Sequence, residues 1–176
     1  EADFRNSTGA VIDTAVTEGA RVTVGNATSH DNAASIGGAT GMSTQVRLGG
    51  ANNHLLENVA IYNNTGTLGA ATTVAAGSII VLSNTGGTVR IINSTIANNT
   101  FPSSTGTINS AGLGWASGQA GTVTVQNSIL TGNTFNGVAA DAATLSGAGG
   151  GYTSITNLIG TTVNFVNAAG GDYRLA

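Results

Sequence analysis

Apolar and polar residues alternate in short runs along this chain, and the clearest run is Val89–Thr100 (VRIINSTIANNT). Similar runs occur at His54–Thr65 (HLLENVAIYNNT) and Val123–Thr134 (VTVQNSILTGNT). Weaker copies occur at Val22–Ala33 and Thr153–Thr161. Alternation with a period of two is typical of β-strands, because successive side chains point to opposite faces. Since no segment has a convincing helical period, the chain is predicted to be all-β.

The copies recur at a nearly constant interval when their central asparagines are aligned. The steps are 32, 35, 34 and 30 residues, and the asparagines are Asn26, Asn58, Asn93, Asn127 and Asn157. A near-constant step of this size is the signature of a solenoid. One repeat cannot bury its apolar face alone, so neighbouring repeats must stack. We therefore expect a single domain over residues 1–176, with 1–20 as an incomplete first coil and 152–176 as the terminal coil.

The alignment separates apolar from polar columns. Two residues before the asparagine the column is apolar throughout: Val24, Leu56, Ile91, Val125 and Ile155. Three residues after it the column is apolar in the three clear copies: Ser29, Ile61, Ile96, Leu130 and Gly160. These columns are predicted to face inward. Three residues before the asparagine the column is mostly polar and is expected to face outward, and Leu55, Val59 and Ile92 are expected to be outward apolar residues.

Each repeat is predicted to contain three short strands, one before the asparagine, one just after it and one about 20 residues later. Val89–Ile92, Thr95–Ala97 and Gly77–Ser83 are examples of the three kinds. Equivalent strands of successive repeats would pair in parallel at about 4.8 Å. Three strands per turn of the chain make a parallel β-helix, here of about five coils.

The asparagines have a physical reason to recur. A sharp bend between strands often requires a positive φ, which asparagine tolerates better than other residues with a side chain. Its amide can also bond to the amide of the next coil and form a ladder. A second predicted ladder follows the second strand and consists of Asn32, Asn64, Asn99 and Asn133.

The runs VRIINSTIANNT and VTVQNSILTGNT resemble the coils of right-handed parallel β-helix proteins of the pectin-lyase-like superfamily, in particular large bacterial secreted and surface proteins. The ending TNLIGTTVNFVNAAGGDYRLA is similar to how such domains close. The resemblance covers roughly Val22–Ala176 and implies a right-handed parallel β-helix. Because its motifs are structural, it implies little about activity.

The amino-acid composition excludes several classes of function. Charged residues make up 7% of the chain, there is no Lys, and the net charge is −3, so no basic patch exists to hold nucleic acid. Cysteine is absent, which excludes disulfides and thiolate metal sites. No run approaches the roughly 20 apolar residues of a membrane helix, so membrane insertion is not expected. Low charge with abundant Thr, Asn, Ser, Ala and Gly favours an extracellular or cell-surface location.

Residues with catalytic chemistry are scattered. The eight acids rarely share a column, so no metal or cofactor is expected, although a carboxylate pair across coils would suit a glycosidase. His54 is interpreted as a strand-edge residue and His30 as a surface residue beside Asp31. Trp115 is a candidate platform for stacking a sugar, with core packing as the alternative.

The ends of the repeat array suggest self-association. We see no obvious cap at either end, and exposed strand edges pair readily with other chains. DFRN and DYRL share an Asp-aromatic-Arg pattern, which makes Phe4, Arg5, Tyr173 and Arg174 candidate assembly residues. We therefore expect a non-enzymatic structural protein whose copies join head to tail into a filament or surface layer. A carbohydrate-active β-helix, either a polysaccharide lyase or a glycan-binding adhesin, is the alternative.

Overall fold

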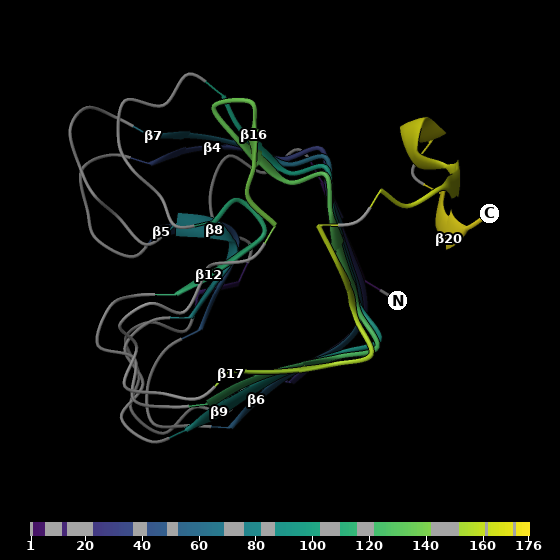
Figure 1. The fold of residues 1–176 in the computed structure, drawn as a ribbon. Coiled ribbons are helices and arrows are strands. Elements are labelled where there is room, and N and C mark those ends of the chain that lie inside the picture. Colours follow the sequence, from purple (N-terminus) through teal and green to yellow (C-terminus); the bar gives the residue numbers. More distant parts are fainter. Residues whose placement is uncertain are drawn as a thin grey trace.

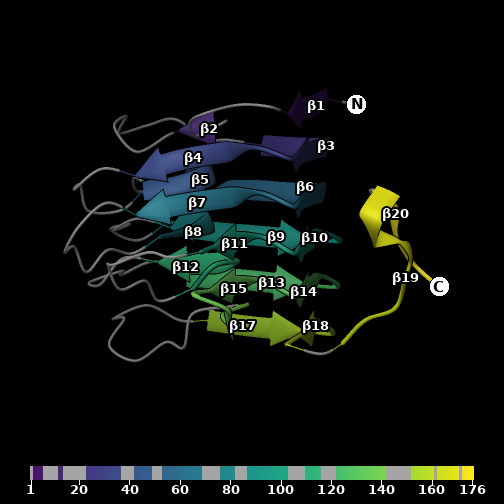
Figure 2. The same ribbon diagram turned by 90° about the horizontal axis from the view of Figure 1, so that it is seen from above.

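A computed structural model gives the fold of the chain and describes residues 2–5, 12–13, 23–36, 42–48, 53–68, 76–81, 87–102, 110–115, 122–141, 152–160, 162–170 and 172–176. The described residues are almost entirely β-strands, and most of the strands are parallel. They form a strongly curled arrangement in which equivalent strands lie above one another (Figures 1 and 2). This architecture is compatible with a β-helix.

The largest sheet in the described part has nine strands and contains both sides of the first bend of each repeat. Along the stack it comprises β1 (Ala2–Arg5), β3 (Thr23–His30), β6 (His54–Tyr62), β9 (Thr88–Ile92), β10 (Thr95–Ala97), β13 (Thr122–Gln126), β14 (Ile129–Thr131), β17 (Tyr152–Ile155) and β18 (Leu158–Ile159). In β3 and β6 the strand continues through the central asparagine, whereas later repeats break there. The predicted strands on either side of the asparagine are therefore confirmed in position.

A second sheet follows the second bend of each repeat, and the sequence did not predict it. It comprises β4 (Ala33–Ile36), β7 (Thr65–Leu68), β11 (Thr100–Phe101), β15 (Thr134–Phe135) and β16 (Val138–Ala139). β16 is antiparallel to β15. These strands are short and consist mostly of small residues, so they lack a clear apolar alternation, which explains why the pattern missed them.

The predicted third strand of the repeat is present as a further parallel sheet. It comprises β2 (Ile12–Asp13), β5 (Met42–Leu48), β8 (Ala76–Val81) and β12 (Leu113–Trp115). Residues 1–20 contribute β1 and β2, which pair with β3 and β5 at one end of the stack.

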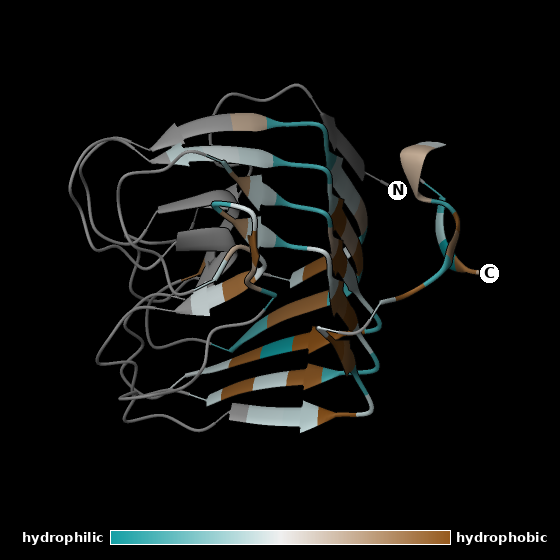
Figure 3. Cartoon of the chain, turned by 45° about the horizontal axis from the view of Figure 1, so that its top comes forward, coloured by the Kyte–Doolittle hydropathy of each residue, from teal (hydrophilic) through white to brown (hydrophobic). Residues whose placement is uncertain are grey.

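The core lies inside the curl, where the inward columns of the sheets meet. Its buried members are Leu48, Leu56, Val59, Ile61, Val89, Ile91, Ile96, Leu113, Val123, Val125 and Leu130. The predicted inward positions Ile91 and Ile96 are confirmed, with exposures of 0% and 1%. The prediction for Val59 was wrong, because it is buried (6% exposed) directly after the bend at Asn58. Apolar and polar colours alternate along the strands of the stack (Figure 3).

The last part of the chain leaves the stack. After β18 it runs to the side of the molecule and forms β19 (Phe165–Asn167), the short helix η1 (Ala168–Gly170) and β20 (Asp172–Leu175) (Figure 2). Among the described strands, β19 and β20 pair only with each other, in antiparallel fashion. The expectation that 152–176 is one terminal coil was therefore wrong beyond residue 160. We call Phe165–Leu175 the side hairpin.

Candidate functional site

The first corner of each repeat is a backbone bend at the central asparagine. Asn26, Asn58, Asn93 and Asn127 have φ values between 49° and 53°, as the sequence predicted for a bend. All four side chains are exposed. Only one amide-to-amide bond joins them in the described part, from Asn58 Nδ2 to Asn26 Oδ1 at 3.3 Å. These asparagines turn the chain, and within the described ranges the predicted ladder of their side chains is limited to this one bond.

In two repeats a serine, Ser94 or Ser128, takes the inward position that follows the first bend. The Val59 amide donates to Ser94 Oγ (3.2 Å), and the Ser94 amide donates to Ser128 Oγ (3.1 Å). Each hydroxyl also donates to the carbonyl two residues before it, at 2.8 Å. Ser94 and Ser128 are 3% and 1% exposed, so these bonds link successive repeats inside the protein.

Asn157 belongs to this serine column and not to the bend column. The pairing of β13 with β17 sets Gln126 opposite Ile155, which places Thr156 opposite Asn127. Thr156 has a φ of 51°, and its hydroxyl donates to Asn127 Oδ1. Asn157 Oδ1 accepts the Ser128 amide at 2.8 Å. The predicted alignment of the last repeat was therefore wrong by one residue, and Ile155, expected to be inward, is 40% exposed.

The second corner has its bend one residue before the second asparagine column. Asp31, Asn63, Asn98 and Gly132 have φ values of 53°, 55°, 54° and 68°. The asparagines that follow them are thereby turned inward, and Asn32, Asn64, Asn99 and Asn133 are at most 2% exposed. A glycine suits the last bend because an added Cβ on Gly132 would lie 2.3 Å from Asn98 Oδ1.

The buried asparagines form a continuous amide ladder. The Oδ1 atoms of Asn64, Asn99 and Asn133 each accept both the backbone amide and the Nδ2 of the asparagine in the preceding repeat, over distances of 2.8–3.1 Å. Nδ2 of Asn64, Asn99 and Asn133 also donates to a main-chain carbonyl of the preceding repeat, at 2.9–3.1 Å. The ladder thus satisfies main-chain groups that the bend removes from the sheets, because buried polar groups must be paired.

Asp141 completes the ladder, and the sequence pattern missed it. Its Oδ1 accepts the Asn133 amide (2.9 Å) and Asn133 Nδ2 (2.8 Å), as the next asparagine would. The tight turn between β15 and β16 brings it there from only eight residues away, so the repeat period gives no signal for it. A carboxylate has no N–H group to donate onward, and the ladder therefore ends at Asp141.

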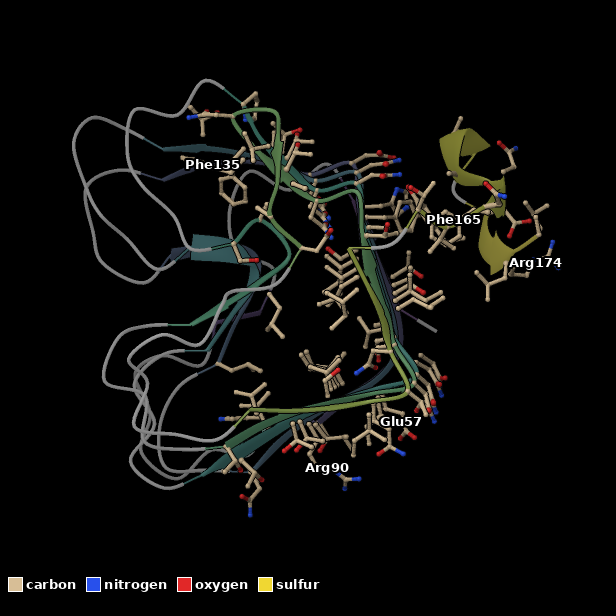
Figure 4. All side chains as sticks on the ribbon, viewed as in Figure 1. Glu57, Arg90, Phe135, Phe165 and Arg174 are labelled. Atoms are coloured by element: carbon tan, nitrogen blue, oxygen red, sulfur yellow. The ribbon has the colours of Figure 1, made fainter. Side chains whose placement is uncertain are left out.

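The side hairpin docks on the outer face beside the second corner. Tyr173 packs on Tyr62 with ring centroids 4.3 Å apart, and Tyr62 stacks on His30 at 4.9 Å. In the next repeat Ala97 lies opposite Tyr62, and its small side chain leaves room for the Tyr173 ring. Phe165 contacts that ring edge-on. Figure 4 shows Phe165 between the hairpin and the stack.

Two bend residues hold the Tyr173 hydroxyl. It donates to Asn63 Oδ1 (2.8 Å) and accepts a bond from Asn98 Nδ2 (3.2 Å), so it joins two repeats. Burial is the main cause that raises the pKa of Tyr173, with a smaller contribution from Asp31. At the exposed edge, hydrogen bonds from Arg174 lower the pKa of Asp172 to about 2.

The candidate assembly residues do not lie together. Phe4 and Arg5 are in β1, opposite Ser29 and His30 at one end of the stack. Tyr173 is buried (8% exposed) against the side of the stack, while Arg174 is exposed and paired with Asp172. The prediction that Tyr173 lies at an assembly end was therefore wrong, because its ring fills the space above Ala97.

The remaining candidate residues lie on several strands and do not form a common site in the described part. Trp115 is the last residue of β12, and its side chain is outside what the structure describes. His54 is the first residue of β6, which agrees with its interpretation as a strand-edge residue, and it is buried (1% exposed). His30 Nδ1 lies 2.7 Å from Asp31 Oδ2. Glu57 and Arg90 point away from the interior in Figure 4.

No protein-family model, curated protein or solved structure matches the chain. Within the described ranges, no group of three or more His, Asp or Glu side chains is placed to hold a metal ion. No helix in the same ranges is long and apolar enough to cross a membrane.

Proposed function

We propose that this chain is a non-enzymatic extracellular structural protein, a right-handed parallel β-helix of about five coils related to pectin-lyase-like proteins. Its copies would stack head to tail into a filament or surface layer. The low charge and the small polar composition support this proposal. The side hairpin also supports it, because the hairpin docks on the flank and leaves the β17–β18 edge without a partner among the described residues.

The observation that carries the proposal is the register across the stack. One column passes through Phe4, Ser29, Ile61, Ile96, Leu130 and Ile159. A second copy placed below would set its Phe4 next to Ile159 and continue the apolar column. Backbone pairing and apolar contact would then extend from copy to copy.

Lysines introduced on the β17–β18 edge test whether copies stack there. Ile155 and Leu158 are 40% and 41% exposed on the two edge strands. In a head-to-tail stack, Ile155→Lys with Leu158→Lys would bring two charges into each junction and prevent association. Val166→Lys is the matched control, because Val166 is 53% exposed but lies on the side hairpin.

The measurement is sedimentation velocity with electron microscopy over a range of protein concentrations. We expect polymers for the parent chain and for Val166→Lys, and monomers for the double variant. A parent chain that stays monomeric at high concentration contradicts the proposal. Equal polymerisation of all three proteins would place the contact elsewhere and contradict the head-to-tail arrangement.

A glycan-binding function is the second candidate, supported by a groove at the first corner. The groove has a volume of about 490 Å³ and is lined by Asn26, Ala27, Thr28, Asn58 and Ala60. Amides and a hydroxyl above small apolar side chains suit sugar hydroxyl groups. Binding to acidic and neutral polysaccharides that is lost in Asn58→Gly, which keeps the positive φ, would favour this function. Cleavage of a polysaccharide would instead indicate an enzyme.

A further inference from the structure

A pocket lies between the lower second corner and the segment that leads to the side hairpin. Its volume is about 460 Å³, and residues from three parts of the chain line it. They are Asn98, Thr131 and Gly132 from the corner, Ala139 and Asp141 after the β15 turn, and Gly160 with residues 162–165 and Ala168 from the departing segment. The departing segment therefore closes one side of a pocket that the stack alone would leave open.

Asp141 contributes a carboxylate to this pocket, and only one of its two oxygens accepts hydrogen bonds from described residues. Both hydrogen bonds that it accepts end on Oδ1, from the amide and the Nδ2 of Asn133. Oδ2 faces Gly160, where an added Cβ would lie 3.8 Å from it, and no described residue donates to Oδ2. Asp141 is 8% exposed and has no ion-pair partner among the described residues. A buried negative charge without a cation is costly.

Asn98 adds a second acceptor at the same pocket. Its Nδ2 donates to the Tyr173 hydroxyl, which orients the amide. Its Oδ1 lies beside Gly132, 2.3 Å from the position of a Cβ added there, and no residue in the described part donates to it. Phe165 also lines the pocket and supplies an aromatic ring. The pocket thus offers one anionic oxygen, one amide oxygen and an aromatic ring.

We propose that this pocket binds a small primary ammonium compound. An ammonium group has three N–H donors and no acceptor, which complements two oxygens that lack donors. Its positive charge offsets the buried Asp141 carboxylate, and its alkyl part would pack against Phe165. A calcium ion fits less well, because it takes 6–8 oxygen ligands, several of them carboxylates. The pocket lies within one copy, so the proposal does not depend on self-assembly.

Titration with n-propylammonium chloride, followed by amide NMR, tests the proposal. We expect saturable shifts at Gly132 and Gly160, and no saturable shifts with n-propanol or calcium chloride. Shifts that do not saturate overturn the proposal. Equal binding of propanol, or binding of calcium but not of the amine, overturns it as well.

Asp141→Asn separates the pocket from the ladder. The asparagine keeps Oδ1 for the two Asn133 bonds, as elsewhere in the ladder, but replaces the anionic oxygen with an NH₂ donor. We expect amine binding to weaken by at least about tenfold, because hydrogen bonds to charged groups are the strong ones. Asp172→Asn is the control, since Asp172 is a carboxylate outside the pocket. Equal affinities of both variants for the amine contradict the proposal.

Ala139→Lys provides a second test that spares the carboxylate. Ala139 is exposed at the pocket, so a lysine there does not have to fit into the core. Its tethered ammonium is expected to reach Asp141 and to compete with propylammonium. Ala139→Gln is the neutral control of similar length. Binding of the amine that is unchanged in Ala139→Lys contradicts the proposal.

Discussion

At the first corner of the repeats that bend at Asn93 and Asn127, the bend residue is an exposed asparagine, and the buried serine that follows it bonds to the neighbouring repeat. At the second corner the bend falls one residue earlier, and the buried asparagine makes those bonds. The backbone angle is nearly the same at both corners. A one-residue shift of the bend therefore decides whether an asparagine turns the chain or ties the repeats together.

The side-chain hydrogen bonds that connect successive repeats are more numerous at the second corner than at the first. Asn99 accepts two hydrogen bonds from Asn64, and its Nδ2 donates to Asn133 and to the Ile61 carbonyl. The Ser94 hydroxyl accepts one bond from the Val59 amide of the preceding repeat and donates one to the Ile92 carbonyl of its own turn. We infer that the second corner is the main polar connection along the stack and that the first corner depends more on apolar packing.

Asn99→Leu is expected to have the largest effect. It removes four side-chain bonds, so the backbone amide and Nδ2 of Asn64 and the Ile61 carbonyl each lose a partner, whereas Asn133 Oδ1 keeps the bond from the backbone amide of residue 99. At roughly 1–3 kcal/mol for each unsatisfied group, the free energy of unfolding should fall on the order of 5 kcal/mol. Urea unfolding measures it. Asn93→Gly, at the exposed bend, keeps the positive φ and should cost less than about 1 kcal/mol. Similar losses in both variants would remove the distinction between the corners.

Gly132→Ala is expected to cause the next largest loss of unfolding free energy. An L-residue with positive φ costs about 1–2 kcal/mol, and the new Cβ would also displace the Asn98 amide that holds Tyr173. We expect a loss of roughly 2–3 kcal/mol by urea unfolding. Gly137→Ala is the matched control, because Gly137 has a φ of 77° and nothing lies within 4 Å of its added Cβ. If Gly137→Ala costs as much, crowding at Asn98 has no role.

Ser94→Ala should have a smaller effect than either change at the second corner. It leaves the Val59 amide and the Ile92 carbonyl without the hydroxyl that bonds both. The expected loss is about 1–2 kcal/mol of unfolding free energy, again from urea titration. A loss as large as that of Asn99→Leu would show that the serine column ties the stack equally well.

The smallest effect is local and depends on pH. Burial raises the pKa of Tyr173 above its ordinary value near 10, so the folded chain binds that proton more tightly than the unfolded chain. The docking contribution is complete below the ordinary pKa and is lost as the pH rises through the raised value. Phenolate absorbance and hairpin NMR signals should change together there. Tyr173→Phe should remove the step, whereas its persistence would assign it to another tyrosine.

The sequence predicted the all-β class, the parallel pairing and the inward columns of the clear repeats, because period-two alternation reports burial directly. It misaligned the last repeat, since the chain reaches the bend at Thr156 only 29 residues after Asn127. It also missed Asp141, which joins the ladder through a tight turn at a separation of eight residues. The side hairpin was mistaken for part of a coil because alternation does not say which strand a segment pairs with.

Hydrogen exchange of the asparagine side-chain amides tests the central distinction most directly. The Nδ2 protons of Asn64, Asn99 and Asn133 are buried and bonded between repeats, so they should exchange only through large openings of the stack. The Nδ2 protons at the first corner are exposed and should exchange at rates near those of a free amide. Similar rates in the two groups, measured on the same sample, would contradict the account.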